Sequence, residues 1–382
     1  MPGSDRAAGK RQNMLDRPFI FAYQNNGHQS DYRTEWSEEL LARTSNTFKM
    51  GFVGDINLLD FPTDRNPFQR MMPYLEGLDV SAGTLEGLLA EPEELFYKPG
   101  FTHVGEGHAA NLAGAGFKAL NLASNVTYGR DAIEATLKQL DAAGIGHAGA
   151  GMDRAQARKP MIIEVNGYRI GMISRTSVFW PNGHEALEDQ AGVVPLRVTT
   201  AYQPHPRLIE LPGAPAIVHT TPDAKELAEL VSDVEALRGQ VDLLFCYFHF
   251  GVSSQRDVVQ YQRTVARAVV DAGADAVFGS HAHVVQPIEV YKGKPLFYGL
   301  SQVIFGWPFV ARLKHPGGPG LIAELAIDGG ERRWTARFVK PDHDTLEPYI
   351  APFSDVPEEV AHLKKTSSDV VTFADDHFVI NT

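Results

Sequence analysis

Short apolar runs alternate along the chain with segments in which apolar residues recur at helical spacing. Runs rich in β-branched and aromatic residues predict strands over residues 48–55, 116–123, 161–165, 169–174, 241–248 and 276–278. Helical spacing occurs between Asp131 and Ala143, where Gly144 supplies a stop signal, and again over 261–272. Strands that alternate with helices indicate an α/β layered domain with a mixed sheet.

Two short turn sequences predict β-hairpins within this pattern. Asn166-Gly167 joins two strand-like runs and is the strongest hairpin signal in the chain, and Lys292-Gly293 lies inside a second hairpin-like stretch, 288–298. Residues 196–224 are rich in proline and predict a long surface insertion that is able to cover a site.

The pattern divides the chain into three parts. Residues 1–45 are polar and unpatterned, and we interpret them as an N-terminal arm that wraps the main domain or a partner. Residues 46–350 form the predicted main domain, which contains the 196–224 insertion. Residues 351–382 are predicted as a polar C-terminal tail that ends in an edge strand at 378–380.

Charge and cysteine content narrow the classes of partner. A formal net charge of -12 and a pI near 5.6 argue against nucleic acid and anionic membranes, which require clustered Lys and Arg. The expected partner is a small-molecule or peptide substrate, and a homo-oligomer is compatible with the sequence. Cys246, the only cysteine, excludes an intrachain disulfide, and its apolar surroundings favour a buried thiol. Without a visible export signal or membrane span, a cytoplasmic location is expected.

Metal-ligating residue types gather where the predicted strands end. His281 and His283 follow the run 276–278, and alternate residues of an extended strand share a face, so both imidazoles are able to converge on one ion. Asp55, Asn125 and His249 also follow apolar runs, and ligands in α/β domains gather at the carboxyl ends of strands. The competing interpretations are solvated or structurally bonded histidines, a capping Asp55 and an Asx-turn Asn125.

Three further residues are candidates for substrate binding. His108 lies in a glycine-containing stretch and is able to act as a flexible donor, whereas Arg175 offers a guanidinium for an anion. Trp180 follows a strand-like segment and is a candidate for the wall of an apolar pocket. Surface roles for His108 and Arg175, and packing under a loop for Trp180, are the alternatives.

The order of several short motifs resembles a known family, the poly-γ-glutamate capsule biosynthesis or CapA-like proteins, whose domain belongs with the calcineurin-like metallophosphoesterases. The resemblance extends over roughly residues 48–306 and rests on these segments: Gly54-Asp55-Ile56-Asn57-Leu58, Thr84-Leu85-Glu86-Gly87, Asn121-Leu122-Ala123-Ser124-Asn125, Phe248-His249-Phe250-Gly251, Asp271-Ala272-Gly273-Ala274-Asp275, Ser280-His281-Ala282-His283-Val284 and Ile288-Glu289-Val290-Tyr291-Lys292-Gly293-Lys294-Pro295. Each motif is weak alone, but their shared order is fairly specific.

The resemblance implies a four-layer α/β/β/α sandwich with mixed central sheets and a metal centre over the strand ends. By position in the motifs, the implied metal ligands are Asp55, Glu86, Asn125, His249, His281 and His283. Such a mixed set suits Zn, Mn or Fe, as one or two divalent ions, although a site without metal is an alternative. Asp55, His249 and His283 are the implied catalytic residues, and Glu86 is also compatible with ordinary acidic surface.

The chain departs from the family pattern at three positions. Family members usually carry Asn-Asn-His where this chain has Ser124-Asn125-Val126, so a histidine that protonates a leaving oxygen is replaced by Val126. Ser280 stands where a histidine is expected, and Phe250 replaces a tryptophan in the predicted pocket wall.

Three functions remain open at the level of sequence. The first is a metal-dependent hydrolase of a phosphoester or an amide-like bond in a small molecule or peptide. The second is an epimerase or lyase that uses the same Asp/His pocket for proton transfer, on an aromatic substrate in one version. The third is a binding protein that keeps the fold and a degraded site.

Overall fold

Two β-sheets face each other in the structure, a computed structural model that describes residues 47–59, 61–90, 107–306, 318–342 and 344–382. The predicted N-terminal arm, 1–45, lies outside the described residues. The larger sheet has ten strands: β1 Phe48–Ile56, β2 Val80–Leu85, β3 Phe117–Asn121, β4 Gly146–Ala148, β15 Gln302–Ile304, β16 Gly320–Asp328, β17 Glu331–Pro341, β18 Pro348–Ala351, β19 Val371–Phe373 and β20 Phe378–Ile380.

The second sheet has six strands, and short strand pairs and helices complete the described elements. Its strands are β6 Met161–Val165, β7 Tyr168–Thr176, β11 Leu243–His249, β12 Ala276–Ser280, β13 Ile288–Tyr291 and β14 Lys294–Phe297. The separate pairs are β5 Ala150–Gly151 with β8 Gly192–Val193, and β9 Val198–Gln203 with β10 Ile217–Pro222. The helices are α2 Met72–Leu75, α3 His108–Gly114, α4 Arg130–Ala142, α5 Arg154–Arg158, α6 Ala224–Arg238, α7 Gln260–Asp271, the 3₁₀ helix η1 Phe353–Asp355 and α9 Pro357–Thr366.

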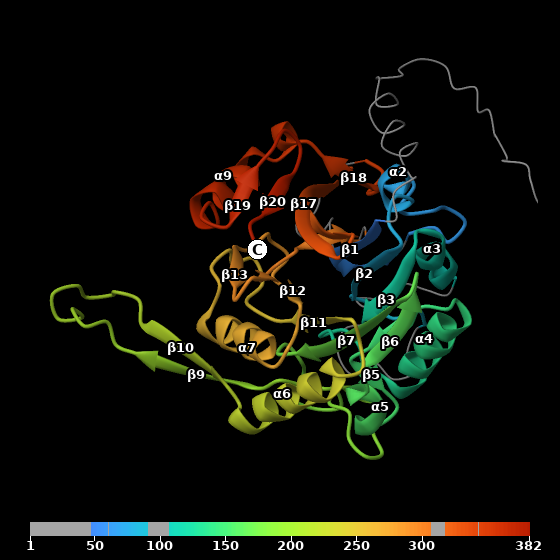
Figure 1. Ribbon diagram of the computed structural model, residues 1–382. Coiled ribbons are helices and arrows are strands. Elements are labelled where there is room, and N and C mark those ends of the chain that lie inside the picture. Colours follow the sequence, from blue (N-terminus) through green and yellow to red (C-terminus); the bar gives the residue numbers. More distant parts are fainter. Residues whose placement is uncertain (1–46, 60, 91–106, 307–317, 343) are drawn as a thin grey trace, which may run out of the picture. The chain divides into compact units, whose positions relative to one another are not determined.

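An aromatic core joins the two sheets. Phe52 of β1 stacks on Phe278 of β12 with ring centroids 4.1 Å apart, and Phe245 of β11 meets Phe52 edge-on at 4.7 Å. A separate apolar cluster packs α6 and α7 against the six-stranded sheet, and α3 and α4 contact β3 and β4 of the larger sheet (Figure 1). The order helix, sheet, sheet, helix confirms the predicted four-layer α/β/β/α architecture with mixed sheets.

Both sheets direct the ends of their parallel strands to one place. In the larger sheet β1, β2, β3 and β4 are parallel, and in the smaller sheet β7, β11, β12 and β14 are parallel. Carboxyl ends of parallel strands lie at one edge of a sheet, where side chains that follow the strands are able to meet. The two sets of ends bring Asp55 and His249 to within 3.5 Å of each other.

The hairpin predictions are confirmed. Asn166 and Gly167 connect β6 and β7 with φ values of 50° and 83°, the left-handed backbone that a two-residue type I′ turn requires. The turn around Lys292 joins β13 to β14. Most predicted strand and helix bounds differ from the observed ones by one or two residues, as the fraying of element ends leads us to expect.

The 196–224 insertion is a β-ribbon, which proline content alone did not indicate. Strands β9 and β10 pair only with each other among the described strands, and Figure 1 shows the ribbon extending beyond α6 and α7. Its base is held by a hydrogen bond from the Tyr261 N–H to the Thr220 hydroxyl, 3.1 Å long. Apolar side chains on it are solvent-exposed, including Ile209 at 97% and Tyr202 at 72%.

The C-terminal residues are not a loose tail. The expected strand at 378–380 is present as β20, but it pairs with both β17 and β19 and therefore does not lie at the sheet's edge. Helix α9 precedes it, and Ser367 at the end of that helix accepts a hydrogen bond from the Ile288 N–H. The alternation of polar and apolar residues predicted β20 itself. It did not predict the second partner, β19, which is only three residues long.

Candidate metal centre

Asp55 lies at the junction of the two sheets. Its N–H donates to Ser301 O at 2.9 Å, next to β15, and its Oδ2 accepts from the His281 N–H at 2.8 Å, beyond β12. The preceding residue is necessarily Gly54, because a Cβ there would stand 1.8 Å from Ser301 O. Sequence and packing therefore hold this fully buried carboxylate in one place.

Glu86 follows β2 and is held through its backbone. Its N–H donates to Ile56 O at 2.9 Å, and its carbonyl accepts from the Asn57 side-chain amide at 2.8 Å. Asn57 is buried and lies two residues after Asp55, so the segment that carries the first acid also holds the backbone of the second. This role of Asn57 was not predicted from the sequence, although its position two residues after a predicted ligand was an available signal.

The two histidines of the H-x-H segment converge for a different reason from the one predicted. Strand β12 ends at Ser280, so His281 and His283 are not alternate residues of a strand. Both adopt positive φ, 81° and 53°, a left-handed conformation that is uncommon for residues other than glycine. Their ring centroids are 5.9 Å apart, and the Ser254 N–H holds the intervening Ala282 carbonyl at 2.8 Å. The prediction that the pair lies in a strand or at its frayed end therefore has the right place in the chain, but alternation of side chains along extended backbone is not what brings the two rings together.

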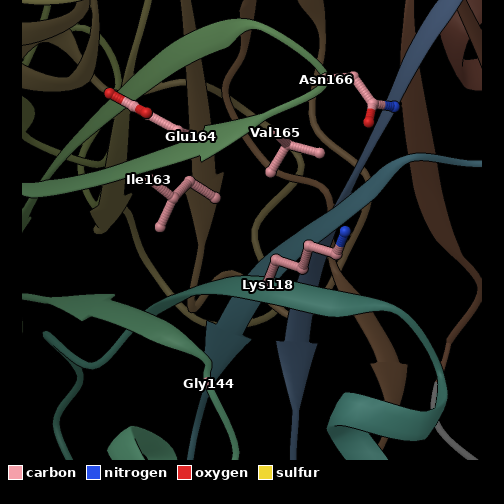
Figure 2. Close-up of a pocket in the computed structure, with 6 residues that line it drawn as sticks. All are labelled: Lys118, Gly144, Ile163, Glu164, Val165 and Asn166. Atoms are coloured by element: carbon pink, nitrogen blue, oxygen red, sulfur yellow. The ribbon is translucent and has the colours of Figure 1, made fainter.

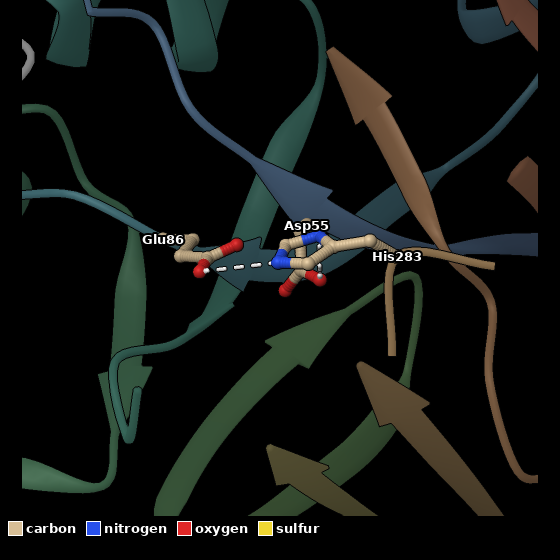
Figure 3. Close-up of side chains that lie close together, drawn as sticks. All are labelled: Asp55, Glu86 and His283. Carbon is tan, nitrogen blue, oxygen red and sulfur yellow. Dashed lines mark ion pairs between the residues drawn. The ribbon is translucent and has the colours of Figure 1, made fainter. Parts of the chain in front are cut away.

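The imidazoles of His249 and His283 approach the same two carboxylates. From His283, Nδ1 is 3.6 Å from Asp55 Oδ2 and Nε2 is 3.8 Å from Glu86 Oε1 (Figure 3). From His249, Nδ1 is 3.5 Å from Asp55 Oδ1 and Nε2 is 3.9 Å from Glu86 Oε1. The ring of His281 lies 4.8 Å from that of His249. Two acids and three imidazoles therefore share one pocket.

Asn125 and Ser280 complete the surroundings of His249. The Asn125 Oδ1 is 2.5 Å from Nε2 of the ring, and the Ser280 Oγ is 2.9 Å from Nδ1. Because an amide oxygen only accepts, the proton of the neutral ring lies on Nε2 in this arrangement and Nδ1 accepts from the serine hydroxyl; as a metal ligand the ring would instead carry its proton on Nδ1, donated to the serine Oγ, and offer Nε2 to the ion. Ser280, which replaces an expected family histidine, thus orients the ring.

Burial keeps the imidazoles neutral. Loss of hydration, the largest cause, lowers the pKa of His249 and of His281 to about 3 and that of His283 to about 4. Burial and the nearby charge of Asp55 raise the pKa of Glu86 well above its ordinary value. Burial also raises the pKa of Asp55, although the nearby imidazole of His283 and the His281 N–H oppose this. Neutral imidazoles are the form that binds metals.

The donor atoms fit a divalent cation. One ligand atom each from Asp55, Glu86 and His283 lies within 4.8 Å of the others. Oε2 of Glu86 and Nδ1 of His281 are buried without a hydrogen bond, which is costly unless another partner satisfies them. Mixed carboxylate, amide and imidazole donors suit Zn, Mn or Fe. His249, Asn125 and His281 offer further donors beside this group.

The residues predicted to bind substrate are used elsewhere. Arg175 is buried and donates to Ser174 O and to Asp233 of α6, so the structure does not support an anion clamp. His108 is fully buried, with Nε2 3.1 Å from Phe61 O. Phe250 is also fully buried and stacks on Phe248 with ring centroids 5.4 Å apart, which makes it part of the core behind the pocket. The predictions for Arg175, His108 and Phe250 all overlooked the burial of these side chains.

Trp180 is half-buried and uses its polar edge. Its indole N–H donates to the Asn125 carbonyl at 2.9 Å, a contact with the backbone of a predicted ligand.

A cavity of about 450 Å³ lies away from this centre, at the start of β3 and the β6–β7 turn (Figure 2). Lys118, Glu164 and Asn166 are among its lining residues. It is at the amino ends of the strands and does not include the Asp55 group.

No helix in the described ranges is both long and apolar enough to cross a membrane.

Two solved structures resemble the chain only weakly. A phosphatase from Mycoplasma pneumoniae is 14% identical, with a TM-score of 0.37 over 80% of this chain and 91% of that one. A purple acid phosphatase from yellow lupin is 9% identical, with a TM-score of 0.34 over 80% of this chain and 53% of that one. TM-scores of this size do not establish a shared fold.

Sequence relatives match this chain over a long stretch. Capsule biosynthesis protein CapA of Bacillus anthracis is 28% identical over 291 residues, 72% of this chain and 64% of that protein. PGA biosynthesis protein CapA of Bacillus subtilis is 27% identical over 270 residues, 67% of this chain and 63% of that protein. The chain thus spans just under two thirds of the length of these relatives. The model of the bacterial capsule synthesis protein PGA_cap family matches residues 24–307, well over half of the chain, and the protein therefore belongs to that family.

Proposed function

We propose that this protein is a metal-dependent hydrolase that acts on a phosphoester or an amide-like bond of a small molecule or peptide. The observation that carries the proposal is the approach of His249 and His283 to the same pair of buried carboxylates, each within 3.5–3.9 Å. Such an acid pair is expensive to bury without a compensating cation.

The residues that would hold one or two divalent ions are Asp55, Glu86, Asn125, His249, His281 and His283. A bound Zn, Mn or Fe ion supplies Lewis acidity and lowers the pKa of a bound water toward neutrality. The chain itself contributes fixed acceptors: Asp55 is held by the His281 N–H and Glu86 by Ile56 and Asn57. This support keeps the carboxylates in position without rearrangement during turnover.

Proton transfer to a leaving group has to come from residues other than position 126. Val126, where the family usually has histidine, is buried at 4% exposure and offers no proton. The predicted catalytic residues His249 and His283 are then the available imidazoles. A leaving group that needs little protonation, such as an aryl oxide, is the substrate on which we expect hydrolysis to be fastest.

The names of the relatives suggest the class of bond. Proteins named for capsule and PGA biosynthesis are similar to this chain, and on that basis an amide-like bond in a peptide-like molecule belongs among the substrates to be tested. The competing hypotheses are an epimerase or lyase on the same pocket and a binding protein with a degraded site. A cytoplasmic location stays a prediction.

One set of assays separates these hypotheses. The full chain is stripped with a chelator, reloaded with Zn, Mn or Fe, and assayed on p-nitrophenyl phosphate, bis-p-nitrophenyl phosphate and γ-glutamyl p-nitroanilide. Metal-dependent release of the chromophore that Asp55→Asn abolishes would support hydrolysis. Metal binding with no release, but with solvent deuterium incorporated into a glutamyl peptide, would favour an epimerase. If the protein showed neither metal binding nor turnover, the hypothesis of a binding protein with a degraded site would remain.

A further inference from the structure

The segment that follows β7 contacts both His249 and Asn125. The Thr176 hydroxyl and the Ser177 N–H donate to the His249 carbonyl at 3.2 and 3.0 Å. A few residues later the Trp180 indole N–H donates to the Asn125 carbonyl at 2.9 Å. Residues 176–184 therefore tie together the backbones of two side chains that themselves meet at 2.5 Å. We call this segment the brace.

His184 closes the brace. Its side chain is fully buried, Nδ1 accepts from the Trp180 N–H at 3.0 Å, and Nε2 is 3.1 Å from the Ser124 carbonyl. Because the Trp180 backbone donates to Nδ1, the ring proton must lie on Nε2, where it is donated to Ser124. Both nitrogens are thus used in fixed roles, and the ring is not available as a catalytic base.

The brace controls two consecutive carbonyls. Ser124 O is held by His184 and Asn125 O by Trp180, so neither of the two peptide planes that flank Asn125 can rotate without breaking a hydrogen bond. The direction of the Asn125 side chain depends on that backbone. Hydrogen-bonded partners behind a metal ligand typically set ligand orientation and change metal affinity by about 10–100-fold when removed.

We infer that His184 and Trp180 are positioning residues that aim the Asn125 amide at His249 and thereby set the affinity of the centre. The inference rests on the proposed function for its link to metal, but the aim of the amide exists without metal. Neither residue is expected to touch the reacting bond.

The test uses variants that remove single contacts in the full chain. His184→Asn keeps an acceptor for Trp180 but loses the donor to Ser124, whereas His184→Gln keeps a donor at the Nε2 position. Trp180→Phe keeps the ring but loses the donor to Asn125. Ser367→Ala removes a buried hydrogen bond from the Ile288 N–H at the start of β13 and leaves the brace contacts intact. It is the control for a purely structural loss.

Two readouts are required. Titration calorimetry of chelator-stripped protein with Mn²⁺ should show affinity about 10–100-fold weaker for His184→Asn and Trp180→Phe, partly restored in His184→Gln, and unchanged for Ser367→Ala. In metal-free protein, NMR of the imidazole N–H protons should show that the His249 Nε2–H signal, protected by Asn125 in the wild type, exchanges rapidly in the two impaired variants.

The outcomes that overturn the inference are distinct from those that overturn the proposed function. Unchanged Mn²⁺ affinity and an unchanged His249 signal in Trp180→Phe would overturn the positioning role, even if His184→Asn failed to fold. A wild-type protein that binds no Mn²⁺, Zn²⁺ or Fe²⁺ would overturn the metal hydrolase. Even then, rapid exchange of the His249 signal in His184→Asn and Trp180→Phe, with a protected signal in the wild type, would still support the brace.

Discussion

The Nε2 atom of His249 lies 2.5 Å from Oδ1 of Asn125, although 124 positions separate the two residues along the chain. His249 ends a strand of the smaller sheet, and Asn125 follows a strand of the larger one. The contact therefore requires both sheets to be packed in register, and it ties the candidate centre to the core between them.

Removal of one imidazole should empty the centre without unfolding the protein. His283→Ala deletes a ring that is 14% exposed and contacts both Asp55 and Glu86, so we expect metal content to fall at least tenfold and hydrolysis with it. Metal analysis and thermal melting measure the two effects. His219→Ala on the exposed ribbon is the matched control. Full activity with a stoichiometric metal count in His283→Ala would contradict the assigned role.

Restoring the family histidine should increase hydrolysis. Val126→His places an imidazole next to Asn125, and general acid catalysis should raise kcat by roughly tenfold or more for a phosphodiester whose leaving group is an alkoxide, with little change for bis-p-nitrophenyl phosphate. The buried position means that the larger ring costs about 1–3 kcal/mol of unfolding free energy. Val126→Leu controls for size alone. A variant that folds, binds metal and gains no activity would show that hydrolysis is not latent here.

A buried carboxylate outside the centre should govern acid stability. Burial alone would raise the pKa of Asp275, but hydrogen bonds from Lys294, the Leu244 N–H and Arg238, with the charge of Arg332, lower it below its ordinary value of 3.8. A lowered folded-state pKa gives stability that is present above pH 3.8 and lost as pH falls through the folded value.

Asp275→Asn is therefore expected to lower the free energy of unfolding at pH 7 by about 2 kcal/mol. The deficit should shrink as pH falls below 3.8, since the wild type then also loses the carboxylate's charge. Denaturant unfolding at pH 7 and pH 3 measures both values. An equal deficit at the two pH values would show that packing, not ionisation, accounts for the loss.

A buried amide pair should stabilise the loop beside the H-x-H segment. Gln262 Nε2 donates to Gln286 Oε1, and Gln286 in turn donates to the carbonyls of Gln255 and Asp257. Gln286→Leu leaves several buried polar groups unpaired and should cost about 3 kcal/mol. Gln262→Leu should lower the free energy of unfolding by less in the double variant than as a single change, with a coupling energy of about 0.5–3 kcal/mol. Strict additivity would mean that the two amides act independently.

Motif order allowed much of the layered fold to be predicted. The strands β1, β3, β6, β7, β11 and β12, the helices α4 and α7 and the turn at Asn166 follow from local periodicity and turn chemistry, which are properties of neighbouring residues. Helix α6 and the long strands β16 and β17 were not predicted. The second partner of β20 and the ribbon at 198–222 were missed because strand pairing depends on distant segments.

The side chains of the candidate centre were predicted, but the reason for their convergence was not. Positive φ at His281 and His283 depends on the loop around Ser254 and on the approach of Ser301 to Gly54, which no local pattern encodes. Arg175 was misjudged because its partner Asp233 lies on a helix 58 positions away. The roles of Asn57, Ser280 and His184 in supporting their neighbours were hidden for the same reason.

Mass-spectrometric metal analysis of untreated, full-length protein, with Asp55→Asn beside it, is the most direct test of a cation shared by Asp55, Glu86 and His283. We predict one or two Zn, Mn or Fe ions per chain in the wild type and a loss of at least half of them in the variant. A wild-type chain that carries none of these metals, and takes up none when they are added, would contradict the centre.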